Sequence, residues 1–233
     1  MSDNTVKTKD GLMKAEEPLM DHFTSKDYKD FYEPAQDSYL FIDSLLNDAS
    51  SLKSMNPYIC LEIGSGSGFV INYLAKLLGP NNGSRLFLAT DINPKAALAT
   101  VKTAQRNSHE NLDVINTSFI QSLERLKGHF DVVLFNPPYV PTESEEIKLG
   151  GIAASWAGGI DGREVIDKLL PQIPHILSGK GFFYMVLVQE NKPKNVISIM
   201  DTYGFNYKVN ISNFLLINLN AKNNNILSSS VLY

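Results

Sequence analysis

The chain of 233 residues lacks most features that would tie it to a membrane, a disulfide scaffold or a metal. Its one cysteine, Cys60, excludes an intrachain disulfide and a structural zinc site built from several cysteines. No apolar run reaches the length of a membrane span, and the first residues lack a signal-peptide core. A net charge of −4 argues against a nucleic-acid partner. We therefore expect a soluble cytoplasmic protein without a metal site, with the nucleus as the alternative location.

What is present fits one α/β domain. A hydrophobic content of 43% and a charged content of 20% are ordinary for a globular protein, and the length allows one substantial core. Residues 1–27 are polar and without a period, which predicts a loosely ordered extension. The Asn- and Ser-rich residues 221–233 predict a frayed tail. The catalytic domain is therefore expected over residues 28–220.

A glycine-rich turn follows the first expected strand. Residues 58–63 are apolar, Gly64, Gly66 and Gly68 follow at alternate positions, and a helix is expected from Phe69. A second expected strand ends in Asp91. Glycines let a ligand lie against backbone N–H groups, and an acid at the next strand tip accepts ribose hydroxyls. This order predicts a nucleoside cofactor.

Glu62 decides which cofactor is expected. A carboxylate two residues before the first glycine is unsuited to the pyrophosphate of a dinucleotide. A sulfonium cofactor with a free amino group tolerates that negative charge. The pattern favours S-adenosylmethionine over NAD.

The second candidate site is the turn Asn136–Tyr139. It follows Asp131-Val-Val-Leu-Phe135, which is typical of a strand buried on both faces. Pro137 and Pro138 end that strand at the edge where α/β sheets bind ligands. Asn136 and the proline carbonyls can accept the hydrogens of a planar NH2 group, and Tyr139 can stack on it. Taken alone, the tetrapeptide would be read as a plain turn. In this context it predicts a reaction at an amide or amino nitrogen.

The remaining segments complete an alternating pattern. Residues 140–160 form a long connection that contains the one tryptophan, Trp156, either as a substrate contact or as a staple to the core. Asp161 to Glu164 is a predicted capping box for a helix over 165–177 that Pro171 and Pro174 should bend. The other expected helices cover 39–46, 94–107 and 196–200, with a short one near 123–126. The other expected strands cover 112–117, near a sheet edge, 181–188, 205–211 and 214–219.

With these motifs together, the chain resembles the class I S-adenosylmethionine-dependent methyltransferases, and more closely the HemK-like glutamine methyltransferases of translation release factors. The match rests on residues 32–38, 62–68, 91–94, 136–139 and 156–165. The resemblance implies a Rossmann-like, seven-stranded, mostly parallel sheet with helices on both faces. It also implies N5-methylation of the glutamine in a Gly-Gly-Gln motif.

The resemblance also implies site residues and a partner. The implied catalytic and substrate residues are Asn136, Pro137, Pro138 and Tyr139, with Trp156 as a further substrate contact. The implied cofactor residues are Ser38, Glu62, Gly64, Gly66, Gly68, Asp91, Ile92, Ser118, Phe119 and Asn136. The short branch of this family works with a small zinc-binding activator protein, which pairs with the edge of the third strand.

One departure from the family pattern matters for the cofactor, while Gln36 and Ser38, where an acid and threonine are commoner, are mild changes. Other activities also compete with the one implied. Ser118 stands where the family has an Asp that accepts a bond from adenine. Adenine-N6 methylation of DNA or RNA uses the same tetrapeptide on a flipped base. Lysine methylation and a non-catalytic scaffold are further alternatives.

Overall fold

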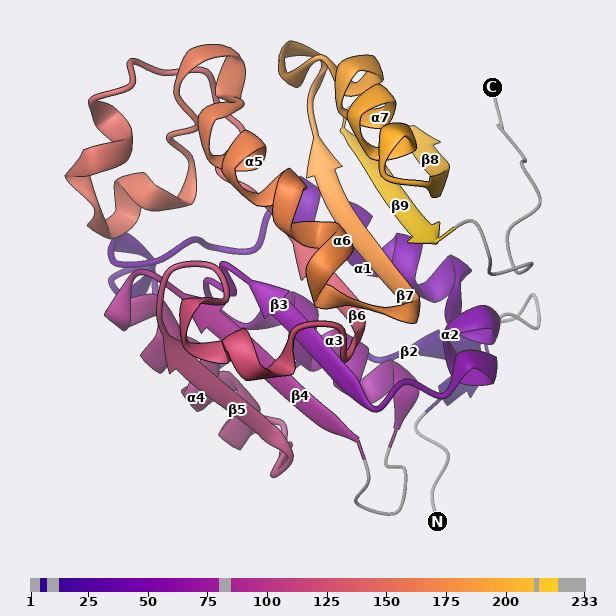
Figure 1. Cartoon of the computed structure of the whole chain (residues 1–233). Helices are drawn as coiled ribbons and strands as arrows, with labels where there is room; N and C mark the ends of the chain where they lie inside the picture. The colour runs from indigo at the N-terminus through magenta and orange to yellow at the C-terminus, as the bar shows by residue number, and fades with distance from the viewer. Residues whose placement is uncertain (1–4, 8–12, 80–84, 212–213, 222–233) are drawn as a thin grey trace.

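A seven-stranded sheet forms the centre of the computed structural model, which describes residues 5–7, 13–79, 85–211 and 214–221 (Figure 1). Its strand order is β5-β4-β3-β6-β7-β9-β8, and β9 alone runs antiparallel to the other six strands. The predicted mostly parallel, seven-stranded sheet is therefore confirmed. The strands are β3 (Ile59–Ile63), β4 (Leu86–Asp91), β5 (Leu112–Asn116), β6 (Phe130–Phe135), β7 (Leu177–Leu187), β8 (Phe205–Ile211) and β9 (Leu215–Ala221).

Helices cover both faces of the sheet (Figure 1). One face carries α1 (Gln36–Asn47), α2 (Ala49–Met55), α3 (Phe69–Leu78) and α4 (Pro94–Arg106). The other carries η2 (Gln121–Leu126), α5 (Glu164–Leu169), η6 (Leu170–Gln172), α6 (Ile173–Ile176), η7 (Gln189–Asn191) and α7 (Pro193–Thr202). Val132 and Leu134 pack into the first layer, and Val133 and Phe135 into the second. This double burial explains the continuous apolar run of β6.

The predicted boundaries hold where local signals are strong. Gly79 ends α3 with a positive φ of 65°. Asn93 caps α4, since its side-chain oxygen accepts a hydrogen bond from the Lys95 N–H at 3.0 Å, and Pro94 occupies the first helical position. β5 lies at the sheet edge, as its polar, modest sequence predicts.

The predicted capping box after residue 160 is wrong. α5 begins at Glu164 with Arg163 at its N-cap position, and no side chain caps it. Asp161 instead adopts a φ of 55° and forms an ion pair with Lys192. The Glu164 carboxylate accepts a hydrogen bond from the Ile160 N–H at 3.1 Å. Asp161 and Glu164 therefore bind partners elsewhere in the fold and do not cap the helix. Pro171 and Pro174 divide the expected single helix into α5, η6 and α6.

The described part of the predicted N-terminal extension is held against α4. After the short antiparallel pair of β1 (Thr5–Lys7) and β2 (Met13–Ala15), the Leu19 N–H donates to Asn107 Oδ1 at 2.8 Å. Arg106 binds both carboxylate oxygens of Asp21 at 2.8 Å. These partners lie far along the chain, so the hydrophobic periodicity of residues 1–27 cannot predict the contacts. Ala221 ends β9, and the rest of the predicted tail lies outside the described residues.

The long connection after β6 folds into three short 3-10 turns over the carboxyl edge of the sheet (Figure 1). They are η3 (Glu146–Leu149), η4 (Gly151–Ser155) and η5 (Ile160–Gly162). Val140 pairs with Ala157 in an isolated parallel bridge, which closes the loop. In the described part of the chain, no helix combines the length and apolar character that a membrane crossing needs.

Candidate functional site

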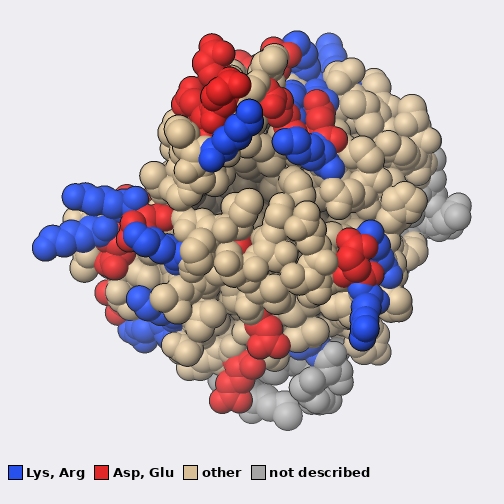
Figure 2. Space-filling model, turned by 60° about the vertical axis from the view of Figure 1, so that its left-hand side comes forward, with Lys and Arg blue, Asp and Glu red and all other residues tan. Residues whose placement is uncertain are grey.

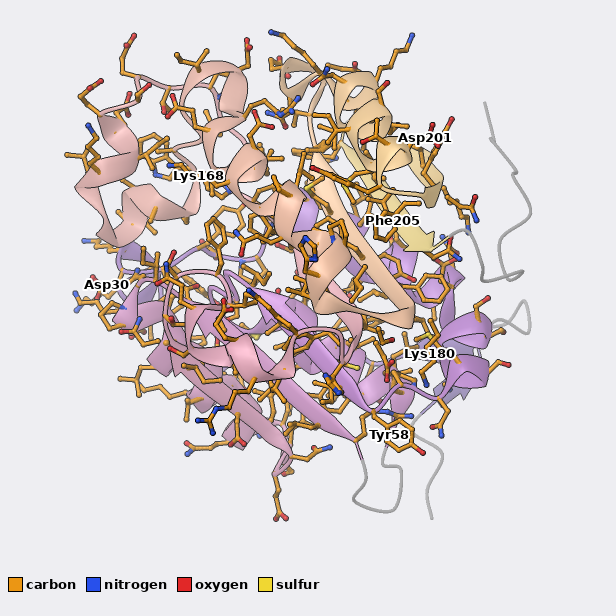
Figure 3. All side chains as sticks on the ribbon, viewed as in Figure 1. Asp30, Tyr58, Lys168, Lys180, Asp201 and Phe205 are labelled. Carbon is orange, nitrogen blue, oxygen red and sulfur yellow. The ribbon has the colours of Figure 1, made fainter. Side chains whose placement is uncertain are left out.

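A cavity of about 270 Å³ opens at the carboxyl ends of β3, β4 and β6. The strand order reverses between β3 and β6, and open α/β sheets bind ligands at such a switch point. Figure 2 shows the surface hollowed here, with charged side chains mainly around the rim. In Figure 3, Asp30 and Lys168 lie toward this end of the sheet, and Tyr58 and Lys180 mark the opposite end.

The structure brings nine of the ten predicted cofactor residues onto the cavity wall. They are Ser38, Glu62, Gly64, Gly66, Asp91, Ile92, Ser118, Phe119 and Asn136. Gly68 is the exception. A Cβ on Gly68 would lie 2.9 Å from the Thr100 Cα, so this glycine permits the close approach of α3 to α4. Its role here is packing beneath the turn.

Asp91 fixes the glycine turn and keeps acceptor capacity. Its Oδ2 accepts the Gly66 N–H at 2.9 Å, and its Oδ1 accepts the Asn93 N–H at 2.8 Å. Burial raises the pKa of the Asp91 carboxyl. Each carboxylate oxygen has a second lone pair, so Asp91 can still accept a ligand hydroxyl.

Glu62 is a buried carboxyl on the cavity wall. It is 3% exposed, and its Oε2 accepts the Ile71 N–H near the start of α3 at 2.9 Å. Burial raises its pKa well above the usual range, and the nearby Asp91 adds to this shift. A positive group bound in the cavity would favour the ionised form of Glu62.

Ser118 and Phe119 form the wall beyond β5. Phe119 has a φ of 48°, and its ring meets Phe135 edge-on at a centroid distance of 6.5 Å. The cavity wall therefore combines an aromatic surface with the hydroxyl group of Ser118. Such a combination suits a flat heterocycle that needs one hydrogen bond.

Asn136 presents an unpaired acceptor at the cavity. Its Nδ2 donates to Asp37 Oδ2 at 2.8 Å. Its Oδ1 is buried and has no hydrogen-bond partner among the described residues. A buried acceptor without a partner costs free energy, which a ligand that brings an N–H group would recover.

Three predicted substrate residues do not line the cavity. Pro137 is buried. The Tyr139 hydroxyl donates to Asp37 Oδ2 at 3.2 Å, and the Tyr139 ring meets Phe214 edge-on. Trp156 is 37% exposed, although Ser155 and Ala157 on either side line the cavity. Burial, helped by Asp37, raises the pKa of Tyr139, so its hydroxyl stays protonated.

Two glycines of the 156–165 segment support the Asn136–Tyr139 turn from behind. A Cβ on Gly158 would lie 2.4 Å from the Pro138 carbonyl oxygen, and one on Gly162 would lie 2.0 Å from that of Tyr139. The Val140 N–H also donates to the Trp156 carbonyl at 3.0 Å. Only glycine allows these backbones so close together.

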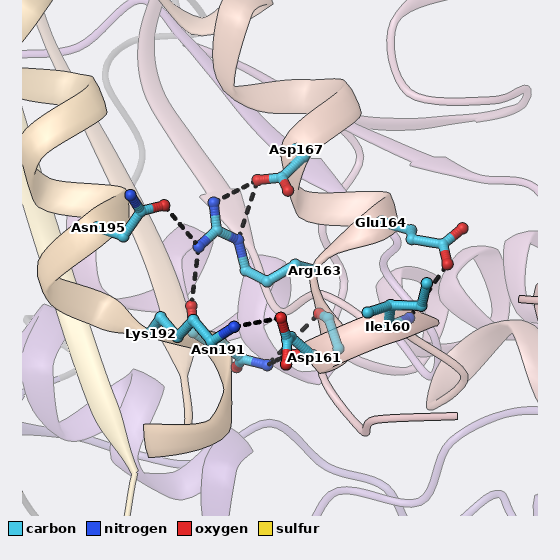
Figure 4. Close-up of polar contacts among 9 residues, drawn as sticks. Ile160, Asp161, Arg163, Glu164, Asp167, Asn191, Lys192 and Asn195 are labelled. Carbon is cyan, nitrogen blue, oxygen red and sulfur yellow. Dashed lines mark hydrogen bonds and ion pairs between the residues drawn. The ribbon is translucent and has the colours of Figure 1, made fainter. Parts of the chain in front are cut away.

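A polar network anchors the same support (Figure 4). The Asn191 Nδ2 donates to the Tyr139 carbonyl at 2.8 Å and to the Asp161 carbonyl at 3.0 Å. Arg163, which is buried, donates to the Asn191 carbonyl at 3.0 Å, to Asn195 and to Asp167. The network therefore fixes the Asn136–Tyr139 turn through Asn191. The side-chain donors of Asn191 and Arg163 named here bind acceptors within the protein.

Sequence reasoning missed Asp37, Tyr32, Gly158, Gly162 and Asn191. Asp37 stands beside Ser38 in the segment that carried the resemblance, which was the one available signal. Its donors come from the turn after β6, its own helix and the preceding loop, so only the fold reveals them. The contacts of Gly158, Gly162 and Asn191 are equally non-local.

Comparison with curated proteins finds several relatives, while no family model matches the chain. Mouse methyltransferase HEMK2 is 44% identical over 80% of this chain and 85% of its own length. The Schizosaccharomyces pombe eRF1 methyltransferase catalytic subunit mtq2 is 38% identical over 81% and 85%. A putative protein N5-glutamine methyltransferase of Methanocaldococcus jannaschii is 34% identical over 79% and 85%.

Solved structures share the fold at lower identity. A chain of the E. cuniculi Mtq2–Trm112 complex superposes with a TM-score of 0.55, at 24% identity over 82% of this chain and 98% of that one. The Precorrin-6y C5,15-methyltransferase of Geobacter metallireducens gives a TM-score of 0.58, at 12% identity over 86% and 94%. The architecture is thus the class I methyltransferase fold.

Proposed function

Because the chain belongs to the HemK-like glutamine methyltransferases, we propose that it N5-methylates the glutamine of the Gly-Gly-Gln motif in a class 1 translation release factor. The observation that carries this proposal is the unpaired Asn136 Oδ1 at the cavity wall. An S. pombe relative is an eRF1 methyltransferase catalytic subunit, which supports the choice of substrate.

The residues of the cavity fit S-adenosylmethionine. Asp91 retains lone pairs for ribose hydroxyls, Ser118 and Phe119 suit adenine, and Glu62 suits a cationic amino group. Ser38, Gly64, Gly66 and Ile92 complete the proposed contacts. When bound, S-adenosylmethionine supplies an electrophilic methyl group on a sulfonium.

The chain's own residues would act by positioning. An amide nitrogen is a weak nucleophile because its lone pair is delocalised into the carbonyl. Asn136 Oδ1 and a carbonyl of the Pro137–Pro138 pair, of which Pro138 lines the cavity, would each accept one N–H of the substrate NH2, which orients the nitrogen toward the methyl carbon. Tyr139, whose hydroxyl donates to Asp37, would limit rotation of the amide plane indirectly, through the contact between Asp37 and Asn136. Such catalysis depends on geometry and fixed dipoles, with no strong general base.

Transfer of labelled methyl groups tests this function. The chain, with and without its activator, is incubated with release factor, the same factor with its motif glutamine changed to Asn, nucleic acid, and histone. We expect label only on the unchanged release factor. Label on nucleic acid would support adenine-N6 methylation, label on histone would support lysine methylation, and no label anywhere would support a scaffold.

We further propose that the open edge of β5 binds a small zinc-binding activator. An E. cuniculi relative of the same fold was solved with Trm112, which supports a small partner. The Phe87 N–H donates to the Asn111 carbonyl, and the Thr117 N–H donates to the Asp91 carbonyl, both at 3.0 Å. Odd-numbered residues of this strand therefore bond to β4. Because backbone groups alternate along a strand, those of Leu112, Val114 and Asn116 face the open edge.

A proline at position 114 should weaken binding of the activator without destabilising the fold of the chain. Val114→Pro removes an outward N–H and leaves the bonds to β4 intact, so we expect activator affinity to fall by roughly tenfold with little change in Tm. Ile115→Pro is the matched control, because it removes an inward N–H and should lower the Tm of the isolated chain. Titration calorimetry and thermal melts measure both effects. Wild-type affinity in Val114→Pro would exclude pairing at this edge.

Cofactor binding should depend on pH through Glu62. A bound ammonium group favours the Glu62 carboxylate and lowers its raised pKa, so binding releases a proton. Affinity should therefore rise with pH, from the ordinary carboxyl range up through the raised pKa of the free protein. Calorimetry in buffers of different ionisation enthalpy measures the released protons. Glu62→Gln should bind more weakly and remove this release, whereas proton release that is unchanged in Glu62→Gln would assign it to Asp91.

A further inference from the structure

We propose that Asp37 is a positioning residue that holds Asn136 as an obligate acceptor, and so makes the pocket selective for NH2 groups over carboxylates. This inference deepens the proposed function, on which its choice of substrate rests. Asp37 does not line the cavity, so it acts through Asn136 and not by touching the substrate.

Asp37 collects hydrogen bonds from donors on three sides. It is the second residue of α1 and is 1% exposed. Its Oδ1 accepts the Tyr32 hydroxyl at 2.9 Å and the Ser38 N–H at 2.8 Å. Its Oδ2 accepts the Asn136 Nδ2 at 2.8 Å and the Tyr139 hydroxyl at 3.2 Å. The Ser38 hydroxyl also donates to Oδ1, at 3.4 Å. An ionised carboxylate, which only accepts, satisfies all of these donors.

This environment permits one orientation of the Asn136 amide. With Nδ2 toward Asp37, the contact joins a donor to an acceptor. Rotation of the amide by 180° would set Oδ1 against the carboxylate, so two acceptors would face each other in a buried place. Asp37 therefore keeps Nδ2 on its own side and leaves Oδ1 as the free group of Asn136.

The fixed orientation gives a basis for selectivity. A substrate amide brings two N–H donors, which match Asn136 Oδ1 and a proline carbonyl. A carboxylate of the same shape brings only acceptors, and it also approaches the negative charge of Asp37. A site that pairs one group and leaves its isostere unpaired discriminates strongly between them. Glutamine and glutamate side chains have the same shape and differ in whether they carry this NH2 donor or a second, negatively charged acceptor oxygen.

The isosteric change Asp37→Asn tests the role. An amide at position 37 can donate to Asn136 Oδ1, so the Asn136 amide can turn and present Nδ2 to the substrate. We expect kcat for release-factor methylation to fall about tenfold or more, while the affinity for S-adenosylmethionine, measured by calorimetry, stays within about threefold. A kcat within about twofold of wild type would overturn the proposal.

Asp48 offers a matched control at the other end of α1. It is 6% exposed and accepts hydrogen bonds from the Tyr184 hydroxyl at 3.1 Å, Asn218 Nδ2 at 2.7 Å and Lys208 Nζ at 2.8 Å. Asp48→Asn makes the same chemical change far from the cavity, so it should lower the Tm and leave kcat near wild type. An equal loss of kcat in Asp37→Asn and Asp48→Asn would show that Asp37 contributes only to stability, and it would overturn the proposal.

A glutamate version of the substrate gives a readout that loss of stability does not produce. Release factor with the motif Gln changed to Glu is measured as an inhibitor of methylation of the normal factor. The wild type and Asp48→Asn should bind it poorly. Asp37→Asn should narrow the preference for Gln over Glu by about tenfold, because the repelling charge is gone and Asn136 can donate. An unchanged preference counts against the proposal.

The proposal and the proposed function can fail separately. The side-chain NH2 resonances of Asn136, assigned by their loss in Asn136→Ala, report on its orientation without any substrate. Protection from solvent exchange in the wild type, lost in Asp37→Asn and kept in Asp48→Asn, supports the role of Asp37. Unprotected resonances in the wild type overturn it. Absence of methylation by the wild type would instead refute the proposed function and leave this result standing.

Discussion

Asn136→Ala is expected to lower kcat by about 100-fold or more, the scale seen when one preorganised polar group is removed from an active site. The substitution removes a buried, unpaired acceptor at the cavity wall. Without it, one N–H of the substrate amide loses its partner, and the nitrogen is no longer held in line with the methyl carbon. Affinity for S-adenosylmethionine should change little, because the proposed ribose, adenine and amino contacts involve other residues. Single-turnover methyl transfer and calorimetry measure the two quantities.

Asn111→Ala is the control for this variant. The Asn111 side-chain amide donates to the Arg85 carbonyl at 2.8 Å, at the opposite end of the sheet from the cavity. Its loss should cost about 1 kcal/mol of stability and leave the methyl-transfer rate unchanged. Turnover near wild type in Asn136→Ala would remove Asn136 from the mechanism. A large loss of cofactor affinity would place its main role in cofactor binding.

Among the substitutions proposed here, Gly162→Ala should produce the largest loss in the free energy of unfolding. Gly162 has a φ of 65°, where an L-residue costs roughly 1–2 kcal/mol. Its Cβ would lie 2.0 Å from the Tyr139 carbonyl oxygen and 2.5 Å from Asn191 Nδ2, so the backbone of the Asn136–Tyr139 turn must move. Overpacking of this kind adds about 1–3 kcal/mol. A displacement of about 1 Å at the turn should also lower kcat by about 100-fold.

Gly204→Ala separates the two causes. Gly204 has a φ of 82°, but a Cβ there meets nothing within 4 Å. It should show only the backbone cost, roughly 1–2 kcal/mol, with normal turnover. Chemical denaturation gives the stabilities, and steady-state assays give kcat. If Gly162→Ala were no worse than Gly204→Ala in both measurements, the supporting role of the 156–165 segment would be refuted.

The elements whose signals are local could be predicted from the sequence. A continuous apolar run located β6, because a strand buried on both faces needs one. Asn93 and Pro94 located the start of α4, and Gly79 located the end of α3. The strand-turn-helix order predicted a ligand site at the carboxyl ends of the strands, where the cavity lies.

The contacts that position the site could not be predicted in the same way. Asp37 gathers donors from as far as 102 residues along the chain, and no spacing rule encodes such a meeting. Gly68 looked like part of the ligand-binding turn, yet its missing side chain serves Thr100 of α4. Asp161 and Glu164 have the sequence of a capping box, but Lys192, Ser144 and Ile160 compete for them. Tertiary partners decided each case.

Phe31 and Tyr32 form part of the cavity wall and belong to the segment before α1, outside the seven-stranded sheet. The Lys95 side chain and the Asn93 amide tether this segment through Asp30, and Phe31 packs on Ala96 and Ala99 of α4. Proteolytic trimming up to residue 32 would leave all seven strands in place and would remove Met20 from the edge of the first hydrophobic layer. Such a fragment would melt cooperatively and give the far-ultraviolet spectrum of a native protein, yet its donor pocket would lie open to water on one side.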